Sequence, residues 1–308
     1  MEGFLLFYKP VNWTNRTILG FLKRTTNQTR IGHAGTLDPF AEGLMVVAIG
    51  RKYTRELHTL LTESRKEYLA TIELGKTSDT FDITGAITEA ESNTIPSCED
   101  IVHAIEQSFL GDRLQTPPVY SAKKFGGKRL RDMATETHAP ALAAERAKHV
   151  TLYEYEIISY NYPTLIIRLV VSSGYYIRTF GSELGTALGT GAYLTKLIRT
   201  RINEYTVAQA LNPEDIDGGI IETTGTITGA VQGIGFRYFL QEHAHKLGIS
   251  GTAQNLSDGS ISFRAQGHLQ QIAKFLTLAK QGPEGAHIDD HHFITRKPVG
   301  LLTDFTVF

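Results

Sequence analysis

The chain has 308 residues, 41% of them hydrophobic, and a formal net charge of −1. This length and composition suffice for one large or two ordinary packed domains and exclude a disordered or low-complexity protein. The single cysteine excludes an internal disulfide, no apolar run approaches the roughly 18 residues of a membrane span, and no signal peptide is visible, so we expect a cytoplasmic protein.

The first two thirds of the chain predict an alternation of strands and helices. Strands are expected at about 3–8, 68–74, 150–160 and 164–172. Helices are expected from the N-cap Thr14 to about residue 25, from the N-cap Ser97 to about residue 110, and at 178–188 and 192–199. Because strict βαβ alternation is missing, the pattern favours an α+β domain around a mainly antiparallel mixed sheet with flanking helices.

After Leu211 the character of the sequence changes. Residues 212–219 are polar and rich in turn formers, which indicates a linker. The rest predicts strands at about 222–229, 249–255, 259–266 and 286–295, helices at about 235–247 and 268–281, and a terminal strand. This order is βαββαβ, the small ferredoxin-like plan. We therefore expect one domain over residues 1–216 and a second over residues 220–308.

Basic residues are clustered although the net charge is near zero. Residues 1–37 carry five lysines and arginines against one acid, and residues 113–131 and 196–201 form two further basic clusters. Such clusters can contact nucleic-acid phosphates on an otherwise neutral protein. The alternative is that these charges are solvated faces without a partner.

Asp38 lies in a glycine-punctuated loop at residues 32–43, which also contains Glu42. Turn statistics alone favour a turn with a capping Asp. The loop reads Gly-His-Ala-Gly-Thr-Leu-Asp-Pro-Phe-Ala-Glu-Gly, which resembles the signature of bacterial tRNA pseudouridine-55 synthases, the TruB family. Further blocks resemble that family in the same order: Gly3–Pro10, Lys66–Tyr68, Tyr120–Arg129 and Ser173–Thr179. The resemblance covers roughly residues 3–210 and implies the pseudouridine-synthase fold.

The family's reaction breaks the N1–C1′ bond of uridine and rejoins the ring through C5, which requires neither cofactor nor metal. The resemblance implies that Asp38 is the nucleophile, although the sequence leaves open whether it attacks the base or the sugar. It implies that Arg178 pairs with Asp38 and that Tyr68 stacks on the flipped uracil. The alternatives are a phosphate contact for Arg178 and a core position for Tyr68.

Four further residues complete the implied RNA site. His33 would fill the space that the flipped base leaves, Tyr176 and Leu197 would line the pocket, and Lys9 would lie at its rim. Their alternatives are a loop histidine, core packing for the two pocket residues, and an exposed surface lysine. Two features depart from the family: residues 51–54 read Arg-Lys-Tyr-Thr where Ala-Thr-Lys is usual, and its C-terminal RNA-binding extension is not recognised.

Residues 229–239 resemble the phosphate loop of acylphosphatases. The resemblance implies that this loop forms an anion-binding nest at a helix N-terminus, made of Gln232, Gly233, Ile234, Gly235 and Phe236. Arg237 would clamp the phosphate and Asn255 would orient the attacking water. Ala230, Thr252 and Gln254 depart from the family pattern.

We therefore expect a tRNA pseudouridine-55 synthase joined to an acylphosphatase-like domain, acting on the T arm of tRNA and on a small acyl phosphate. We expect no cofactor, no metal, no membrane contact and a monomer. Two alternatives stay open. The C-terminal domain could be catalytically silent and serve tRNA binding, or the whole chain could be a tRNA-folding chaperone.

Overall fold

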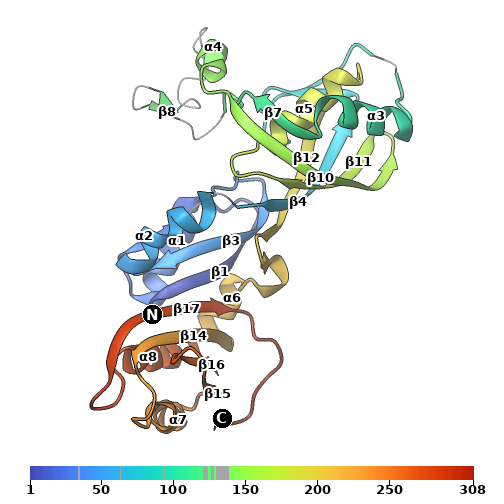
Figure 1. Ribbon diagram of the computed structural model, residues 1–308. Coiled ribbons are helices and arrows are strands. Elements are labelled where there is room, and N and C mark those ends of the chain that lie inside the picture. Colours follow the sequence, from blue (N-terminus) through green and yellow to red (C-terminus); the bar gives the residue numbers. More distant parts are fainter. Residues whose placement is uncertain (34, 63, 93, 121–123, 126–127, 130–138) are drawn as a thin grey trace. The chain divides into compact units, whose positions relative to one another are not determined.

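The computed structural model describes residues 1–33, 35–62, 64–92, 94–120, 124–125, 128–129 and 139–308. The chain divides into two compact units (Figure 1). Unit 1 comprises residues 1–39, 43–62 and 205–308, and unit 2 comprises residues 40–42 and 63–204. In the part of the chain that is described, no helix is long and apolar enough to span a membrane.

Unit 1 is built on a mixed sheet with the strand order β18-β15-β16-β14-β17-β1-β3, and β2 pairs with β3. Its strands are β1 (Gly3–Lys9), β2 (Ile31–His33), β3 (Glu42–Ile49), β14 (Ile221–Ala230), β15 (Ser250–Asn255), β16 (Ile261–Gly267), β17 (His287–Arg296) and β18 (Phe305–Val307). Neighbours run antiparallel except β1 with β17 and β15 with β18, which are parallel.

The helices of unit 1 are α1 (Asn15–Thr26), α2 (Arg51–Thr62), the 3₁₀ turn η2 (Val207–Gln209), α6 (Pro213–Gly218), α7 (Phe236–Leu247) and α8 (Leu269–Ala279). α1 packs on Phe7, whose ring lies 6.3 Å from that of Phe21, and α2 packs on Phe4, whose ring lies 5.2 Å from that of Tyr53. Successive side chains of a strand point to opposite faces, so α1 and α2 lie on opposite faces of β1.

The expected βαββαβ order is confirmed as β14-α7-β15-β16-α8-β17, followed by the short strand β18. The helices cover one face of these strands (Figure 1), where the ring of Phe275 from α8 lies 5.4 Å from that of Phe263 and 5.8 Å from that of Phe305. The strand β17 then pairs with β1, with Phe4 opposite Ile294. The C-terminal strands therefore share one sheet with the first strand of the chain.

Unit 2 is built on an antiparallel sheet in the order β12-β4-β11-β10-β7. Its main strands are β4 (Lys66–Leu74), β7 (Gly111–Gln115), β10 (Lys148–Asn161), β11 (Thr164–Val171) and β12 (Ala192–Ile202). Two ribbons, β5 (Lys76–Ser78) with β6 (Ile87–Glu89) and β8 (Lys124–Phe125) with β9 (Lys128–Arg129), and the helices α3 (Cys98–Ser108), α4 (Ala139–Ala144) and α5 (Ile177–Ala187) complete it.

The helix α5 packs directly on β4 and β12. Gly181 permits this approach, because a Cβ atom there would lie only 2.5 Å from the Leu194 side chain. Alternate residues of β4 are buried, starting with Lys66 and Tyr68. Since Ile72 on this buried face also neighbours Gly181, Tyr68 projects from the same face of the sheet that α5 covers.

Two local predictions are wrong. Residues 192–199 are not a helix but most of β12, because Tyr, Thr and Ile suit a strand that pairs along the whole length of β4. Residues 213–218 form the short helix α6 rather than a linker. Asn212 is the N-cap of this helix, and Pro213 occupies its first position, where proline is favoured. The N-caps Thr14 and Ser97 are confirmed by hydrogen bonds from Thr17 N and Asp100 N.

Two candidate active sites

The Asp38 loop follows β2 and is held in unit 1 by two donors. The Lys9 ammonium donates to the carbonyl oxygens of Pro10 at 3.0 Å and Pro39 at 3.1 Å, and the Asn12 N–H donates to Pro39 O at 2.8 Å. Lys9 is fully buried, so the alternative of an exposed surface lysine is wrong. Because Pro39 is fixed from two sides, the half-buried Asp38 side chain is carried by a rigid turn.

His33 ends β2, opposite Val47 of β3, and is half-buried. The preceding Gly32 lies under α2, since a Cβ atom there would be 3.3 Å from the Thr54 side chain. The histidine thus sits at the start of the loop that carries Asp38, on a strand fixed to the sheet. The role of His33 beside the carboxylate stays a prediction.

Unit 2 gathers a second group of predicted residues on one face of its sheet. Tyr68 pairs with Arg199 across β4 and β12, and Ala70 pairs with Leu197. Residues directly opposite each other in a sheet share a face, so Tyr68, Leu197 and Arg199 lie together under α5. All three are almost completely buried. Sequence reasoning placed Arg199 only in a basic cluster and missed that it is the largest fully buried side chain of the described residues.

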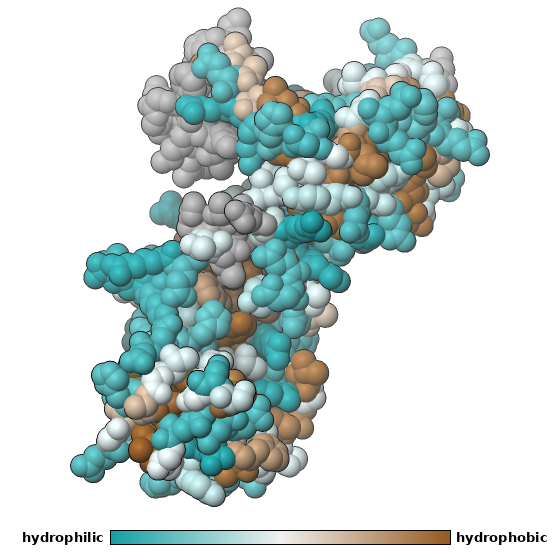
Figure 2. All heavy atoms as spheres, viewed as in Figure 1, coloured by the Kyte–Doolittle hydropathy of each residue, from teal (hydrophilic) through white to brown (hydrophobic). Residues whose placement is uncertain are grey.

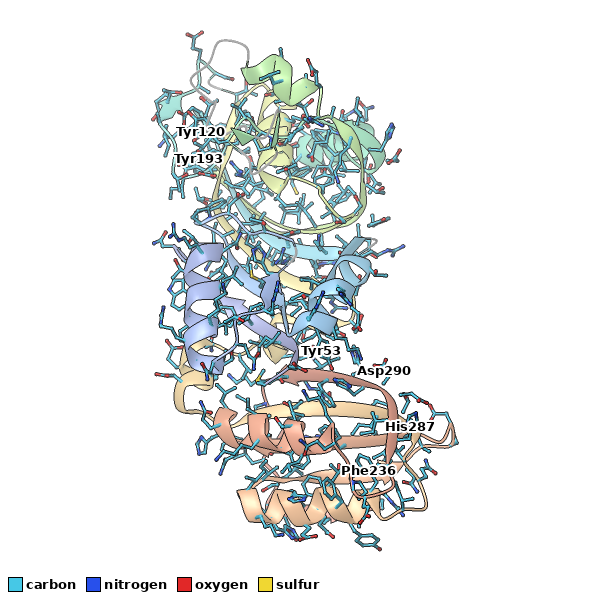
Figure 3. All side chains as sticks on the ribbon, turned by 90° about the vertical axis from the view of Figure 1, so that its left-hand side faces the viewer. Tyr53, Tyr120, Tyr193, Phe236, His287 and Asp290 are labelled. Atoms are coloured by element: carbon cyan, nitrogen blue, oxygen red, sulfur yellow. The ribbon has the colours of Figure 1, made fainter. Side chains whose placement is uncertain are left out.

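Arg178 lies in the first turn of α5 and is nearly fully buried. Its guanidinium donates to Thr80 O and to Tyr120 O, each at 2.9 Å, and lies 3.4 Å from the Asp82 carboxylate. Tyr120 is marked in Figure 3. Asp82 itself accepts hydrogen bonds from Thr80 Oγ1 and Thr84 N, both at 2.9 Å. The guanidinium plane is therefore fixed by three groups from two segments of the chain.

Asp82 is a site residue that sequence reasoning missed. The available signal was an aspartate with a threonine two residues away on either side, which is typical of a carboxylate that organises its own loop. Tyr176, at the N-cap of α5, is fixed through its backbone: its N–H donates to Gln115 Oε1 at 2.8 Å and its carbonyl accepts from Gln115 Nε2 at 3.0 Å.

Lys66 adds a further buried cation beside Tyr68. Its ammonium donates to Ser173 Oγ at 3.2 Å, and Lys148 donates to the carbonyl oxygen of the same serine at 3.0 Å. Burial, together with the charges of Arg199 and Lys148, lowers the pKa of Lys66 to about 8. This face of unit 2 is thus strongly cationic beneath its surface.

The second site is the loop between β14 and α7. Gly233 and Gly235 have φ of 78° and 77°, a backbone conformation that favours glycine, and Gly235 is the N-cap of the helix. The Gln232 amide donates to Leu256 O at 2.9 Å and Ser260 O at 2.8 Å. It thereby ties the predicted loop to the turn that follows Asn255.

Arg237 follows in the first turn of α7 and donates to the backbone oxygen of Phe308. Phe236 (Figure 3) is buried and anchors the helix start, and Gly282 makes room for its ring, because a Cβ atom there would lie 2.7 Å from it. Ile234 is exposed at the tip of the loop. The helix N-terminus and Arg237 together can bind an anion.

The structure brings the predicted residues together in groups. Asp38, His33 and Lys9 lie in unit 1, whereas Tyr68, Tyr176, Arg178 and Leu197 lie in unit 2. The pairing of Asp38 with Arg178 stays a prediction. Within the Tyr120–Arg129 block, residues 121–123 and 126–127 lie outside the described residues.

Comparisons with known proteins identify both parts of the chain. Residues 23–177 match the TruB family pseudouridylate synthase (N terminal domain), and residues 223–307 match the acylphosphatase family. The chain is 41% identical over 216 residues to tRNA pseudouridine synthase B of Protochlamydia amoebophila (strain UWE25), covering 70% of this chain and 80% of that protein. It is 41% identical over 221 residues to tRNA pseudouridine synthase B of Chlamydia pneumoniae, covering 72% and 89%.

A solved structure resembles the same region. A chain of a Cbf5-Nop10-Gar1 complex aligns with a TM-score of 0.52 and 26% identity, covering 70% of this chain and 53% of that chain.

Proposed function

We propose a specific reaction and a specific target for this chain, which belongs to the TruB family of pseudouridylate synthases. The chain is an isomerase that forms pseudouridine in tRNA. The proposed target is the uridine at position 55 in the TΨC arm. The observation that carries the proposal is the Asp38 loop, in which a single carboxylate is presented on a turn fixed by Lys9 and Asn12.

The reaction rearranges one nucleotide without loss of atoms. The N1–C1′ bond breaks, a C5–C1′ bond forms, C5 gives up its proton and N1 takes one up. In the proposed mechanism the Asp38 carboxylate attacks the nucleotide and is released at the end. The base must first leave its stack, which takes a few kcal/mol, and His33 fills the space that it leaves.

The proposed pocket for the flipped base is the buried face of unit 2. Tyr68 stacks on the uracil and lies next to the exchanging C5 proton, while Leu197 and Tyr176 enclose the ring. Arg178 orients the Asp38 carboxylate, and Asp82 holds that guanidinium in place. A pocket fixed by buried hydrogen bonds favours the reacting geometry over a merely bound base.

The test maps the modified uridine. Unmodified tRNA is incubated with wild-type protein or Asp38→Ala, treated with carbodiimide, and read by reverse transcription. We expect a stop at position 55 with wild type and none with Asp38→Ala, which should still bind tRNA. The proposal is contradicted if the reverse-transcription stop at position 55 persists with Asp38→Ala, or if the wild type produces its stop at another position. Full binding without any wild-type product would favour the chaperone alternative.

We propose acyl phosphate hydrolysis as a second activity, located at the loop between β14 and α7. Its support is the loop geometry: two glycines with positive φ at a helix start, Arg237 in the first turn, and Asn255 tied to the loop through Gln232. Water oriented by Asn255 attacks the acyl phosphate, giving a carboxylate and inorganic phosphate, while Arg237 and the backbone N–H groups bind the phosphate.

Benzoyl phosphate provides the test of this second activity. We expect turnover by the wild type, loss in Arg237→Ala, and a large loss in Asn255→Ala, with tRNA modification unchanged in both variants. Absence of wild-type turnover contradicts the proposal and favours a catalytically silent domain that serves tRNA binding.

A further inference from the structure

The helix α1 carries three exposed cations, Arg16, Lys23 and Arg24, and no acidic residue. Among the described residues, none of the three lies within ion-pair distance of a carboxylate, whereas Lys52, Lys246 and Lys280 of the same unit are all paired. The stretch from Gly3 to Leu37 contains no Asp or Glu at all. The protein therefore supplies no internal partner for this positive surface.

The helix dipole accounts for only part of the pattern. Lys23 and Arg24 lie in the last turn, where a cation stabilises the carbonyl end of a helix. Arg16 lies in the first turn, directly after Asn15 and the N-cap Thr14, where a cation is unfavourable and an acid is usual. Since the charge of Arg16 is unfavourable for the helix, we look for another role, and binding of an external anion is such a role.

These cations share one side of the helix with Gly20. Residues 16, 20, 23 and 24 are spaced by three, four and seven or eight positions, so they line one face, and a shallow groove runs along it. A Cβ atom on Gly20 would meet only the tip of Arg24, at 3.6 Å, so core packing does not require glycine here. Figure 2 shows hydrophilic residues over α2, the helix on the opposite face of β1. Gly20 leaves the middle of the groove open for a close approach.

The start of α1 follows directly on a contact with the Asp38 loop. Asn12, three residues before the helix, donates to Pro39 O at 2.8 Å, and α1 runs away from that contact. At 1.5 Å per residue, Lys23 and Arg24 lie about 10–12 Å along the axis from Arg16, which spans a few successive phosphates of one strand. The opposite side of the helix is fixed to the core through Ile18 and Leu22.

We propose that this groove of α1 binds the phosphate backbone of the tRNA strand that leads away from the modified nucleotide. The inference rests on the proposed tRNA activity and extends it to a second contact. Arg16 binds the phosphate nearer to the Asp38 loop, Lys23 and Arg24 bind phosphates farther along, and Gly20 lets the sugar–phosphate chain lie close to the helix. The contact is independent of base sequence.

Charge reversal tests the groove. The double variant Arg16→Glu/Lys23→Glu is compared with wild type and with Lys274→Glu, an exposed and unpaired lysine on α8 among the described residues. We expect KM for tRNA to rise at least about tenfold in the double variant, with kcat at saturating tRNA unchanged. The slope of log K against log salt should shrink by about 0.7–0.9 for each lost phosphate contact. Lys274→Glu should behave as wild type.

Gly20→Gln separates binding from folding. Glutamine has the higher helix propensity, so thermal stability should not fall, yet its side chain would fill the groove and raise KM. An unchanged KM and salt slope in the double variant, or an equal change in Lys274→Glu, overturns the inference while wild-type activity at position 55 still supports the proposed function. If wild type forms no product, filter binding of tRNA to the same variants decides the inference separately.

Discussion

The Phe293 backbone N–H donates to the Tyr53 hydroxyl at 3.1 Å, and the same hydroxyl donates to His291 O at 3.3 Å. Tyr53 belongs to α2, which also packs on Gly32 at the start of the Asp38 loop, whereas Phe293 belongs to β17 of the acylphosphatase-like part. The neighbouring Lys52 binds Asp290 and His291 O. Tyr53 and Asp290 are labelled in Figure 3. Lys52 and Tyr53, which lie in the stretch 51–54 that departs from the TruB pattern, therefore connect α2 to the C-terminal strand β17.

Tyr53→Phe should lower the free energy of unfolding of unit 1 by about 1–3 kcal/mol, because the buried Phe293 N–H loses its acceptor. Burial also raises the pKa of Tyr53 above its ordinary value, so the hydroxyl stays protonated and can keep donating. Urea unfolding measures the change. Tyr155→Phe, which removes an exposed hydrogen bond to Glu106, is the control and should alter stability much less. Equal stability of Tyr53→Phe and wild type would contradict the role given to this contact.

The sequence predicted the features that depend on local spacing. The caps Thr14 and Ser97, the alternation of β4, the βαββαβ order and the glycine loop at 233–235 are all set by neighbours a few residues apart. The pairing of β1 with β17 could not be predicted, because it joins residues 290 positions apart, such as Phe4 and Ile294, and involves only two residue pairs. The burial of Arg199 was not predicted, because residues in a charge run are usually solvated. Asp82 was not predicted as a site residue, because its partner Arg178 is distant in sequence.

Asp82→Asn should reduce pseudouridine formation by at least about tenfold, because Arg178 loses the buried carboxylate that helps to fix its guanidinium. The effect should fall on the single-turnover rate rather than on tRNA affinity, since Asp82 acts through Arg178. Glu156→Gln, which removes an exposed partner of Arg168, is the matched control and should leave the rate unchanged. A wild-type rate in Asp82→Asn would remove Asp82 from the account.

Lys66 makes stability depend on pH in a defined window. Its pKa is about 8 in the folded protein and 10.5 in the unfolded chain, so between these values the unfolded chain binds more protons there. Stability attributable to Lys66 therefore rises with pH across this window. Relative to Lys66→Met, the wild type should gain up to about 3 kcal/mol between about pH 7 and pH 10.5. Urea unfolding of both proteins at the two pH values measures the difference, and a parallel pH dependence would contradict it.

Gly233→Ala should weaken inorganic phosphate binding at the second site and destabilise the protein by about 1 kcal/mol, because its φ of 78° is unfavourable for any residue with a Cβ atom. No atom lies within 4 Å of the added Cβ position, so a steric clash does not contribute. Gly218→Ala has equal space and no positive φ, which makes it the control. Calorimetric titration with phosphate should show weaker binding only in Gly233→Ala. Identical affinities would mean that the loop does not form the anion site.

The central claim is that Asp38 carries out the isomerisation. Since C5 loses its proton when it bonds to C1′, tRNA labelled with tritium at C5 of uridine 55 reports the chemistry directly under single-turnover conditions. The account predicts release of about one tritium per tRNA by wild type and none by Asp38→Asn, which keeps the size of the side chain but not its charge. Release by Asp38→Asn at the wild-type rate would contradict it.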